Sequence, residues 1–143
     1  MKDFILDIYS KIEKDKLLHK IVRKGLFLEN RRTDLADETQ FLQLAALRLD
    51  KDKTFKPHRH IWKDYDGQII AQESWVVIQG KVKVILYDID DTIVWEDELH
   101  PGDISMTFFG GHNYKILEND TFVYEYKTGP YYGQLLDKRF INE

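Results

Sequence analysis

From about residue 39 onward, the sequence is a succession of short segments of β-type composition, separated by turn-forming residues. Eight such segments are present, and eight strands are the number that builds a double-sheet jelly roll. They span residues 40–49, 54–62, 68–79, 81–87, 92–98, 103–108, 112–117 and 121–127. The sequence therefore predicts an all-β fold, with a jelly-roll barrel over residues 39–127.

The connections between these segments are short and rich in turn residues, as in Asp66-Gly67 and Gly110-Gly111. Short connections indicate antiparallel neighbours. Within 81–87, strict alternation places Val82, Val84 and Leu86 on one face, as a half-buried strand requires.

The ends of the chain differ from this pattern. Between residues 4 and 22, apolar residues recur at spacings near three and four, which predicts an amphipathic helix or two short helices, ended by Gly25. The tail 128–143 is rich in aromatic and charged residues, and we expect it to pack across the barrel or reach a neighbouring subunit. Without repeats or linkers, residues 1–143 are predicted to form a single domain, in which 1–28 is a helical extension.

Composition excludes several classes of function. The formal charge of −4 offers no basic excess for a phosphate backbone, so we expect no nucleic-acid partner. The chain has no cysteine, which removes disulfides, thiolate nucleophiles and iron–sulfur clusters and leaves only N and O atoms as metal ligands. No apolar run suits a signal peptide or a membrane span, so we expect a cytoplasmic protein with no membrane partner.

Two histidines and a glutamate form the pattern that most clearly indicates a metal site. His58 and His60 stand at i and i+2 on a predicted strand and therefore point to the same face. Glu73, on the adjacent antiparallel strand, can add a carboxylate. Two histidines and one carboxylate suit Fe(II) and related ions and leave coordination positions open for water or substrate.

These residues resemble the two motifs of the cupin superfamily, whose fold is a double-stranded β-helix. The first motif matches His58-x-His60, with Glu73 seven residues before Gly80, and the second matches Pro101-Gly102-Asp103 followed by Gly111-His112. The resemblance implies that His112 is a fourth ligand to one divalent transition metal, Fe, Mn, Ni, Co or Zn. The gap between His60 and Glu73 is longer than in most cupins, and we interpret residues 61–72 as an extended hairpin. If Glu73 is not the ligand, Glu125 or Gln72 is the next candidate.

Residues that share a face with the ligands are candidates for the substrate pocket. Trp75 lies on the face of Glu73 and Tyr114 on the face of His112, so both are predicted to bind substrate. On the last strand, either Phe122, Tyr124 and Tyr126 or Val123, Glu125 and Lys127 face inward. We favour the aromatic set, which makes Tyr124 and Tyr126 the predicted catalytic residues. Arg48 is predicted to anchor an anionic substrate.

The chain is similar in size and layout to small cupins encoded beside bacterial cell-surface polysaccharide genes. That resemblance favours a metal-dependent isomerase or epimerase acting on a small oxygen-rich substrate, such as a sugar or nucleotide-sugar. Two alternatives remain, an Fe(II) dioxygenase and a non-enzymatic metal-containing binding or sensing module. A proton-transfer residue facing the metal would favour the isomerase, and an all-apolar cavity the binding module. Because cupins commonly pair through exposed strands, we also expect a homodimer.

Overall fold

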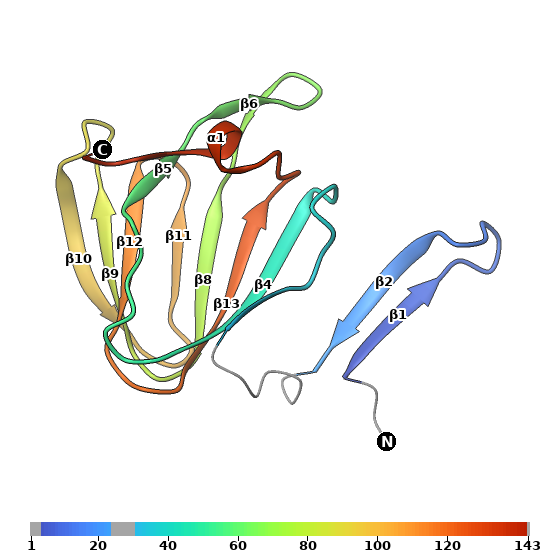
Figure 1. Cartoon of the computed structure of the whole chain (residues 1–143), viewed down its shortest axis with the longest axis horizontal. Coiled ribbons are helices and arrows are strands. Elements are labelled where there is room, and N and C mark those ends of the chain that lie inside the picture. The colour runs from blue at the N-terminus through green and yellow to red at the C-terminus, as the bar shows by residue number, and fades with distance from the viewer. Residues whose placement is uncertain (1–3, 24–30, 143) are drawn as a thin grey trace.

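The computed structural model of the protein describes residues 4–23 and 31–142. Two five-stranded sheets face each other and form a barrel (Figure 1). The first consists of β5 (His58–His60), β9 (Val82–Tyr87), β10 (Ile93–Leu99), β12 (Gly111–Ile116) and β14 (Lys138–Phe140), in the order β10-β9-β12-β5-β14. The second consists of β3 (Arg32–Asp34), β4 (Leu42–Leu49), β8 (Glu73–Gln79), β11 (Ile104–Thr107) and β13 (Thr121–Thr128), in the order β11-β8-β13-β4-β3.

The all-β prediction is confirmed, since each of the eight predicted segments contains a strand. Two of the segments are interrupted. The segment 54–62 contains β5 and the start of β6 (Trp62–Asp64), and 68–79 contains β7 (Gln68–Ile70) and β8. Strands β6 and β7 pair with each other, so the predicted hairpin over residues 61–72 is also confirmed.

The core lies between the two sheets and is built from the inward positions of their strands. Trp75 on β8 stacks on Tyr114 on β12, with ring centroids 3.8 Å apart and planes 5° from parallel. Around this pair, the buried aliphatic residues include Leu47, Val77, Val82, Val84, Ile116 and Val123. The inward face of 81–87 is therefore the one that alternation predicts.

The turn from β8 to β9 depends on Gly80. Its φ of +84° lies in the left-handed region, which residues with a side chain adopt at a cost. A Cβ at this position would also overlap the Thr121 side chain and backbone of the neighbouring strand. Only glycine lets the two segments approach so closely.

The predicted N-terminal helix is wrong. Residues 5–22 form an antiparallel hairpin of β1 (Ile5–Tyr9) and β2 (Leu17–Val22), which projects beyond the barrel on the side of β4 (Figure 1) and contacts it through Val22. The Ser10 hydroxyl accepts hydrogen bonds from the amides of Ile12 and Glu13 in the turn between the strands. In a strand, residues on one face are separated by even spacings. Because this ribbon carries apolar residues on both faces, odd spacings also occur, and together they imitate the spacings of three and four of a helix. The predicted helix end at Gly25 lies outside the described residues.

The tail packs on the barrel, which is one of the two outcomes expected for it. Its helix α1 (Gln134–Asp137) is the only helix in the described parts of the chain, and β14 follows directly and pairs with β5. Asp137, at the junction, is fully buried. The tail thereby supplies a side chain to the interior beside the histidines of β5.

Candidate metal centre

Four side chains converge at one end of the barrel, from three different strands. His58 and His60 come from β5, Glu73 from the start of β8 and His112 from β12. Their candidate ligand atoms all lie within 4.8 Å of one another. Glu73 Oε2 lies 3.0 Å from His60 Nε2 and 2.9 Å from His112 Nε2, and the Nε2 atoms of His112 and His58 are 3.2 Å apart. The group could hold one metal ion.

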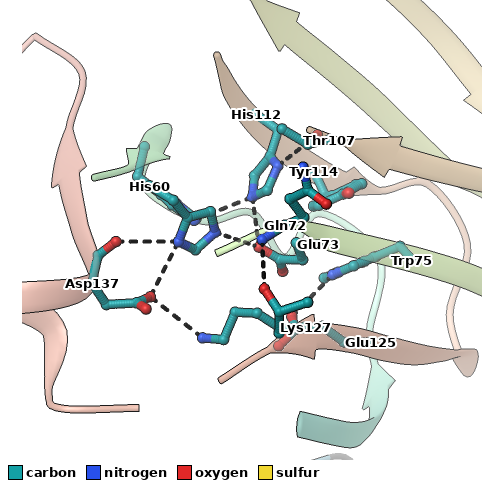
Figure 2. A network of polar contacts seen from close by, with 12 residues as sticks. His60, Gln72, Glu73, Trp75, Thr107, His112, Tyr114, Glu125, Lys127 and Asp137 are labelled. Carbon is teal, nitrogen blue, oxygen red and sulfur yellow. Dashed lines mark hydrogen bonds and ion pairs between the residues drawn. The ribbon is translucent and has the colours of Figure 1, made fainter. Parts of the chain in front are cut away.

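Each histidine is oriented by a second contact at its other ring nitrogen. Nδ1 of His58 lies 3.1 Å from the Lys56 carbonyl oxygen, and Nδ1 of His112 lies 2.9 Å from the Thr107 hydroxyl. Nδ1 of His60 lies 3.1 Å from Asp137 Oδ2 (Figure 2). All three rings therefore turn Nε2 toward the centre, as histidines do when an outer partner fixes a metal ligand. The donor set and its orientation fit a divalent transition metal.

The fully buried Asp137 joins the centre to the tail and to two lysines. Besides contacting His60, it accepts a hydrogen bond from Lys63 Nζ at 2.7 Å. Lys127 Nζ lies 3.5 Å from its other oxygen (Figure 2). Lys63 also donates to the Pro130 carbonyl oxygen. Three groups able to carry positive charge surround this carboxylate, which holds the pKa of Asp137 below its ordinary value despite burial.

The protonation states of the centre suit a cation. Burial, together with the nearby charges of His112 and Lys138, lowers the pKa of His58 to about 3. Burial alone would raise the pKa of Glu73, but His112 and His60 hold it well below its ordinary value. Burial likewise opposes the charged form of His60, yet hydrogen bonds to Asp137 and Glu73 raise its pKa. Neutral imidazole and ionised carboxylate are the metal-binding forms, so His58 and Glu73 are ready to bind a cation, whereas the raised pKa of His60 lets protons compete with the metal there.

The centre forms part of the wall of a cavity of about 500 Å³. Trp75 and Tyr114 also line it and give it an aromatic wall, while their binding of substrate stays a prediction. The other walls carry charged side chains from both sheets. Arg32 and Asp34 come from β3, Glu125 and Lys127 from β13, Lys138 from β14, and Glu38 from the loop after β3. The cavity therefore has both aromatic and charged walls.

Glu125 is a second buried carboxyl group beside the candidate ligands, and unlike Asp137 it lines the cavity. It lies on β13 opposite Trp75, whose Nε1 donates a hydrogen bond to Oε2 at 3.0 Å, and Arg32 Nη2 lies 2.8 Å from Oε1. The Glu125 carboxyl also lies within reach of the negative charge of Glu73. Burial and the charge of Glu73 raise the pKa of Glu125, while Arg32 opposes that rise.

The predicted inward face of the last strand is wrong. Glu125 and Lys127 line the cavity, whereas Tyr124 and Tyr126 lie on the opposite face of β13, where Tyr124 packs against an outer apolar cluster. The register explains this: Lys127 pairs with Glu73 and Glu125 with Trp75, and cross-strand partners point to the same side of a sheet. The predicted catalytic tyrosines are therefore not brought to the metal centre.

Arg48 is likewise outside the cavity. It lies on the outer face of β4, where its Nε pairs with Asp120. The residues that sequence reasoning missed are Arg32, Lys138 and Asp137. Lys127 was signalled by alternation, because it stood with Glu125 in the inward set that we did not favour. Asp137 carried no such signal, since its place depends on the tail folding back onto β5.

Among the described residues, no helix has both the length and the apolar character needed to cross a membrane. No protein-family model matches the sequence, and no curated protein matches it. The comparison with solved structures, in contrast, finds many similar folds.

KdgF from Halomonas sp. is 22% identical with a TM-score of 0.54, and the match covers 68% of this chain and 76% of KdgF. The capsular polysaccharide assembling protein CapF from Staphylococcus aureus is 16% identical with a TM-score of 0.63, covering 80% of this chain and 33% of CapF. A variant of Bacillus subtilis oxalate decarboxylase is 16% identical with a TM-score of 0.59, covering 80% of this chain and 29% of the decarboxylase. The match thus spans about a third of the latter two proteins. All three are cupin-fold proteins, and this chain has the cupin fold.

Proposed function

We propose that this protein is a metal-dependent enzyme that moves a proton on a small, oxygen-rich, anionic substrate, in an isomerase- or epimerase-type reaction. The position of Glu125 carries the proposal. Its carboxyl group lies close enough to Glu73, one of the four candidate ligands, to feel its charge, and it lines the cavity. An acid–base group thereby stands beside the place where substrate oxygens would meet a metal.

One divalent transition ion, Fe, Mn, Ni, Co or Zn, would be held by His58, His60, Glu73 and His112, since ligands of this kind accept all of these metals. When bound, the ion supplies Lewis-acid polarisation of substrate oxygens. The chain contributes preorganisation: the three Nε2 atoms already point to one place because their Nδ1 partners fix the rings.

Glu125 would carry the proton. Arg32 and Trp75 each contact one of its carboxyl oxygens, so the group cannot swing away from the cavity. In this position Glu125 can take a proton from a substrate carbon next to a carbonyl group and return it to the same or the neighbouring carbon. That transfer is the proton movement of an epimerase or an isomerase, respectively.

Two lysines favour an anionic substrate. Lys127 is the cross-strand partner of Glu73 and Lys138 that of His60, so the two ammonium groups flank the centre. Burial and the charge of Lys127 lower the pKa of Lys138. Among the described residues Lys138 makes no ion pair, although it lines the cavity. A carboxylate or phosphate on the substrate would pair directly with Lys138, which takes the anchoring role first expected of Arg48.

The polar walls favour an enzyme over the binding module, for which an all-apolar cavity was expected. A sugar acid or nucleotide-sugar meets both demands of the site, since it offers neighbouring oxygens to a metal and a negative charge to the lysines. The likeness to CapF, named as a capsular polysaccharide assembling protein, agrees with this choice of substrate class.

The metal part of the proposal is tested by elemental analysis of the purified protein beside a His58→Ala, His60→Ala variant. We expect about one equivalent of metal in the wild type and a loss of it in the variant. Equal metal in both proteins, or none in the wild type after growth in metal-replete medium, would refute the proposed metal site.

The proton-transfer part is tested by nuclear magnetic resonance in deuterated water, with uronic acids and keto-sugar acids as probes. The metal-loaded wild type should exchange a carbon-bound hydrogen for deuterium, and Glu125→Gln should lose this exchange while keeping its metal. Glu96→Gln, a surface substitution at an exposed glutamate, is the matched control. If Glu125→Gln still exchanges hydrogen for deuterium, Glu125 is not the proton-transfer residue. Oxygen consumption without exchange would instead identify the dioxygenase.

A further inference from the structure

A second cavity, the aromatic groove, adjoins the cavity that contains the candidate metal centre. It has a volume of about 630 Å³, and its walls include Glu38, Thr39, Tyr65, Pro130, Tyr131 and Tyr132. Glu38 and Tyr131 also line the metal-centre cavity, so the two cavities meet at these residues. Both volumes lie in the range of about 300–1,000 Å³ that is typical of small-molecule sites. The proton transfer proposed above makes no use of the groove.

One wall of the groove comes from the hairpin that lengthens the chain between His60 and Glu73. Tyr65 lies at its tip, where the Tyr65 amide donates a hydrogen bond to the Gly67 carbonyl oxygen. The Tyr65 ring stacks on Phe41, with ring centroids 5.7 Å apart. Strand β6 of this hairpin contacts helix α1 of the tail at the same end of the barrel (Figure 1). A hairpin longer than the cupin pattern requires thus supplies an aromatic wall.

A second wall comes from the segment that follows β13. The Tyr131 amide donates a hydrogen bond to the Glu38 carbonyl oxygen at 2.9 Å, which ties this segment to the loop after β3. Lys127 Nζ lies 4.7 Å from the centre of the Tyr131 ring, and Lys63 Nζ lies 6.0 Å from the centre of the Tyr132 ring. Both distances are within the range of cation–π contacts. The two rings are therefore held in place before any ligand binds.

The groove combines open aromatic surface with a carboxylate. Tyr65 and Tyr132 are 39% and 47% exposed, so a ligand can reach their rings. The face of an aromatic ring carries partial negative charge and attracts positively polarised C–H groups. The Glu38 carboxylate accepts hydrogen bonds from hydroxyl groups. A sugar ring has C–H groups on its faces and hydroxyl groups around its edge, and it therefore matches both features.

The distribution of charge favours an uncharged sugar over a nucleotide in the groove. Lys138, which makes no ion pair among the described residues, is the cross-strand partner of His60 and so lies at the metal centre. Lys127 Nζ lies 3.5 Å from Asp137, which balances its charge. Within the described ranges no cationic side chain lines the groove, and Glu38 lies where the two cavities meet. A diphosphate extending outward from a metal-bound sugar would be repelled by that carboxylate.

We infer that the aromatic groove is a subsite for an uncharged sugar unit, joined by a glycosidic bond to the acidic sugar at the metal centre. The inference rests on the proposed function for the occupant of the first cavity. It narrows the substrate class from sugar acids and nucleotide-sugars to acidic oligosaccharides, and it gives the lengthened hairpin a part in substrate selection.

Isothermal titration of the zinc-loaded full chain tests the inference. The probes are glucuronate, two disaccharides in which glucose is attached to either end of glucuronate, and uridine diphosphate glucuronate. We expect one disaccharide to bind at least about tenfold more tightly than glucuronate, because its second ring stacks on the tyrosines. The nucleotide-sugar should gain no such factor.

Substitutions in the two walls test whether the groove is responsible. Tyr132→Ala and, separately, Tyr65→Ala should each lower the affinity for that disaccharide about tenfold and leave the affinity for glucuronate unchanged. Tyr9→Ala is the matched control, because Tyr9 is 52% exposed on β1 and lines neither cavity. Thermal unfolding shows whether each variant is folded, and the two tyrosines come from different segments, so one variant suffices if the other is unstable.

Disaccharides that bind no more tightly than glucuronate would overturn the inference, as would a preference that survives both tyrosine substitutions in folded variants. Tighter binding of the nucleotide-sugar that Tyr132→Ala abolishes would also overturn it, since the groove would then hold a nucleobase. These titrations need no turnover, so they are independent of the deuterium exchange that tests Glu125. Exchange without a disaccharide preference refutes the subsite alone, and a preference without exchange refutes the proton transfer alone.

Discussion

Replacing Asp137 by asparagine tests how the tail supports the candidate metal centre. The substitution keeps the shape of the side chain but removes the charge that faces His60 Nδ1 at 3.1 Å and Lys63 Nζ at 2.7 Å. Breaking one partner of a buried ion pair costs about 3–5 kcal/mol. We expect the free energy of unfolding to fall by about 3 kcal/mol, near the lower limit, because Lys63 keeps its hydrogen bond to the Pro130 carbonyl oxygen. For a chain of this size, that corresponds to a fall of about 10 °C in Tm.

The same substitution should weaken zinc binding by about 10- to 100-fold, because the His60 ring loses the charged acceptor that fixes its orientation, and an amide oxygen is a weaker acceptor. Thermal unfolding of the metal-free protein and competition with a chromophoric chelator measure the two effects separately. Asp52→Asn is the control: its pair with Lys115, at 3.7 Å on the surface, should contribute less than about 1 kcal/mol. If Asp137→Asn and Asp52→Asn are equally stable and bind zinc equally well, the supporting role assigned to Asp137 is refuted.

Three further predictions concern the cavity and the barrel. Lys138→Met should weaken binding of glucuronate to the zinc-loaded protein by about tenfold and leave binding of glucose unchanged, as isothermal titration can show; an equal loss for both sugars would contradict the anion site. Tyr126→Phe should leave metal content and deuterium exchange at wild-type values, because this side chain lies outside the cavity; loss of exchange would restore the original catalytic assignment. Gly80→Ala should destabilise the fold by about 2 kcal/mol or more in urea titrations, because of the positive φ and the overlap with Thr121, and an unaffected midpoint would contradict that account.

Much of the fold could be predicted because its signals are local. Alternation and turn residues depend on neighbours in the chain, so they located the strands of the barrel and the hairpin at 61–72. The candidate metal ligands were also signalled by local patterns in the sequence. His58 and His60 share a face by spacing alone, and Glu73 and His112 stand at motif positions relative to nearby glycines.

The errors share one physical cause, which is that the side on which a strand is buried depends on its neighbours. The segment 4–22 has apolar residues on both faces, so its spacing imitates a helix, and only pairing between its two halves reveals a ribbon. On β13, alternation defines two faces, but register with β8 decides that Glu125 rather than Tyr124 faces the cavity.

The sequence by itself therefore determined the strands, the turns and the four side chains that could hold a metal, because each is encoded within a short stretch of chain. Only the tertiary structure decided which other carboxyl groups and which lysines lie beside the four candidate metal ligands. Glu125 and Lys138 reach the centre through pairing with β8 and β5, and Asp137 through the return of the tail. Such placements depend on contacts between residues far apart in the sequence, and no local pattern records them.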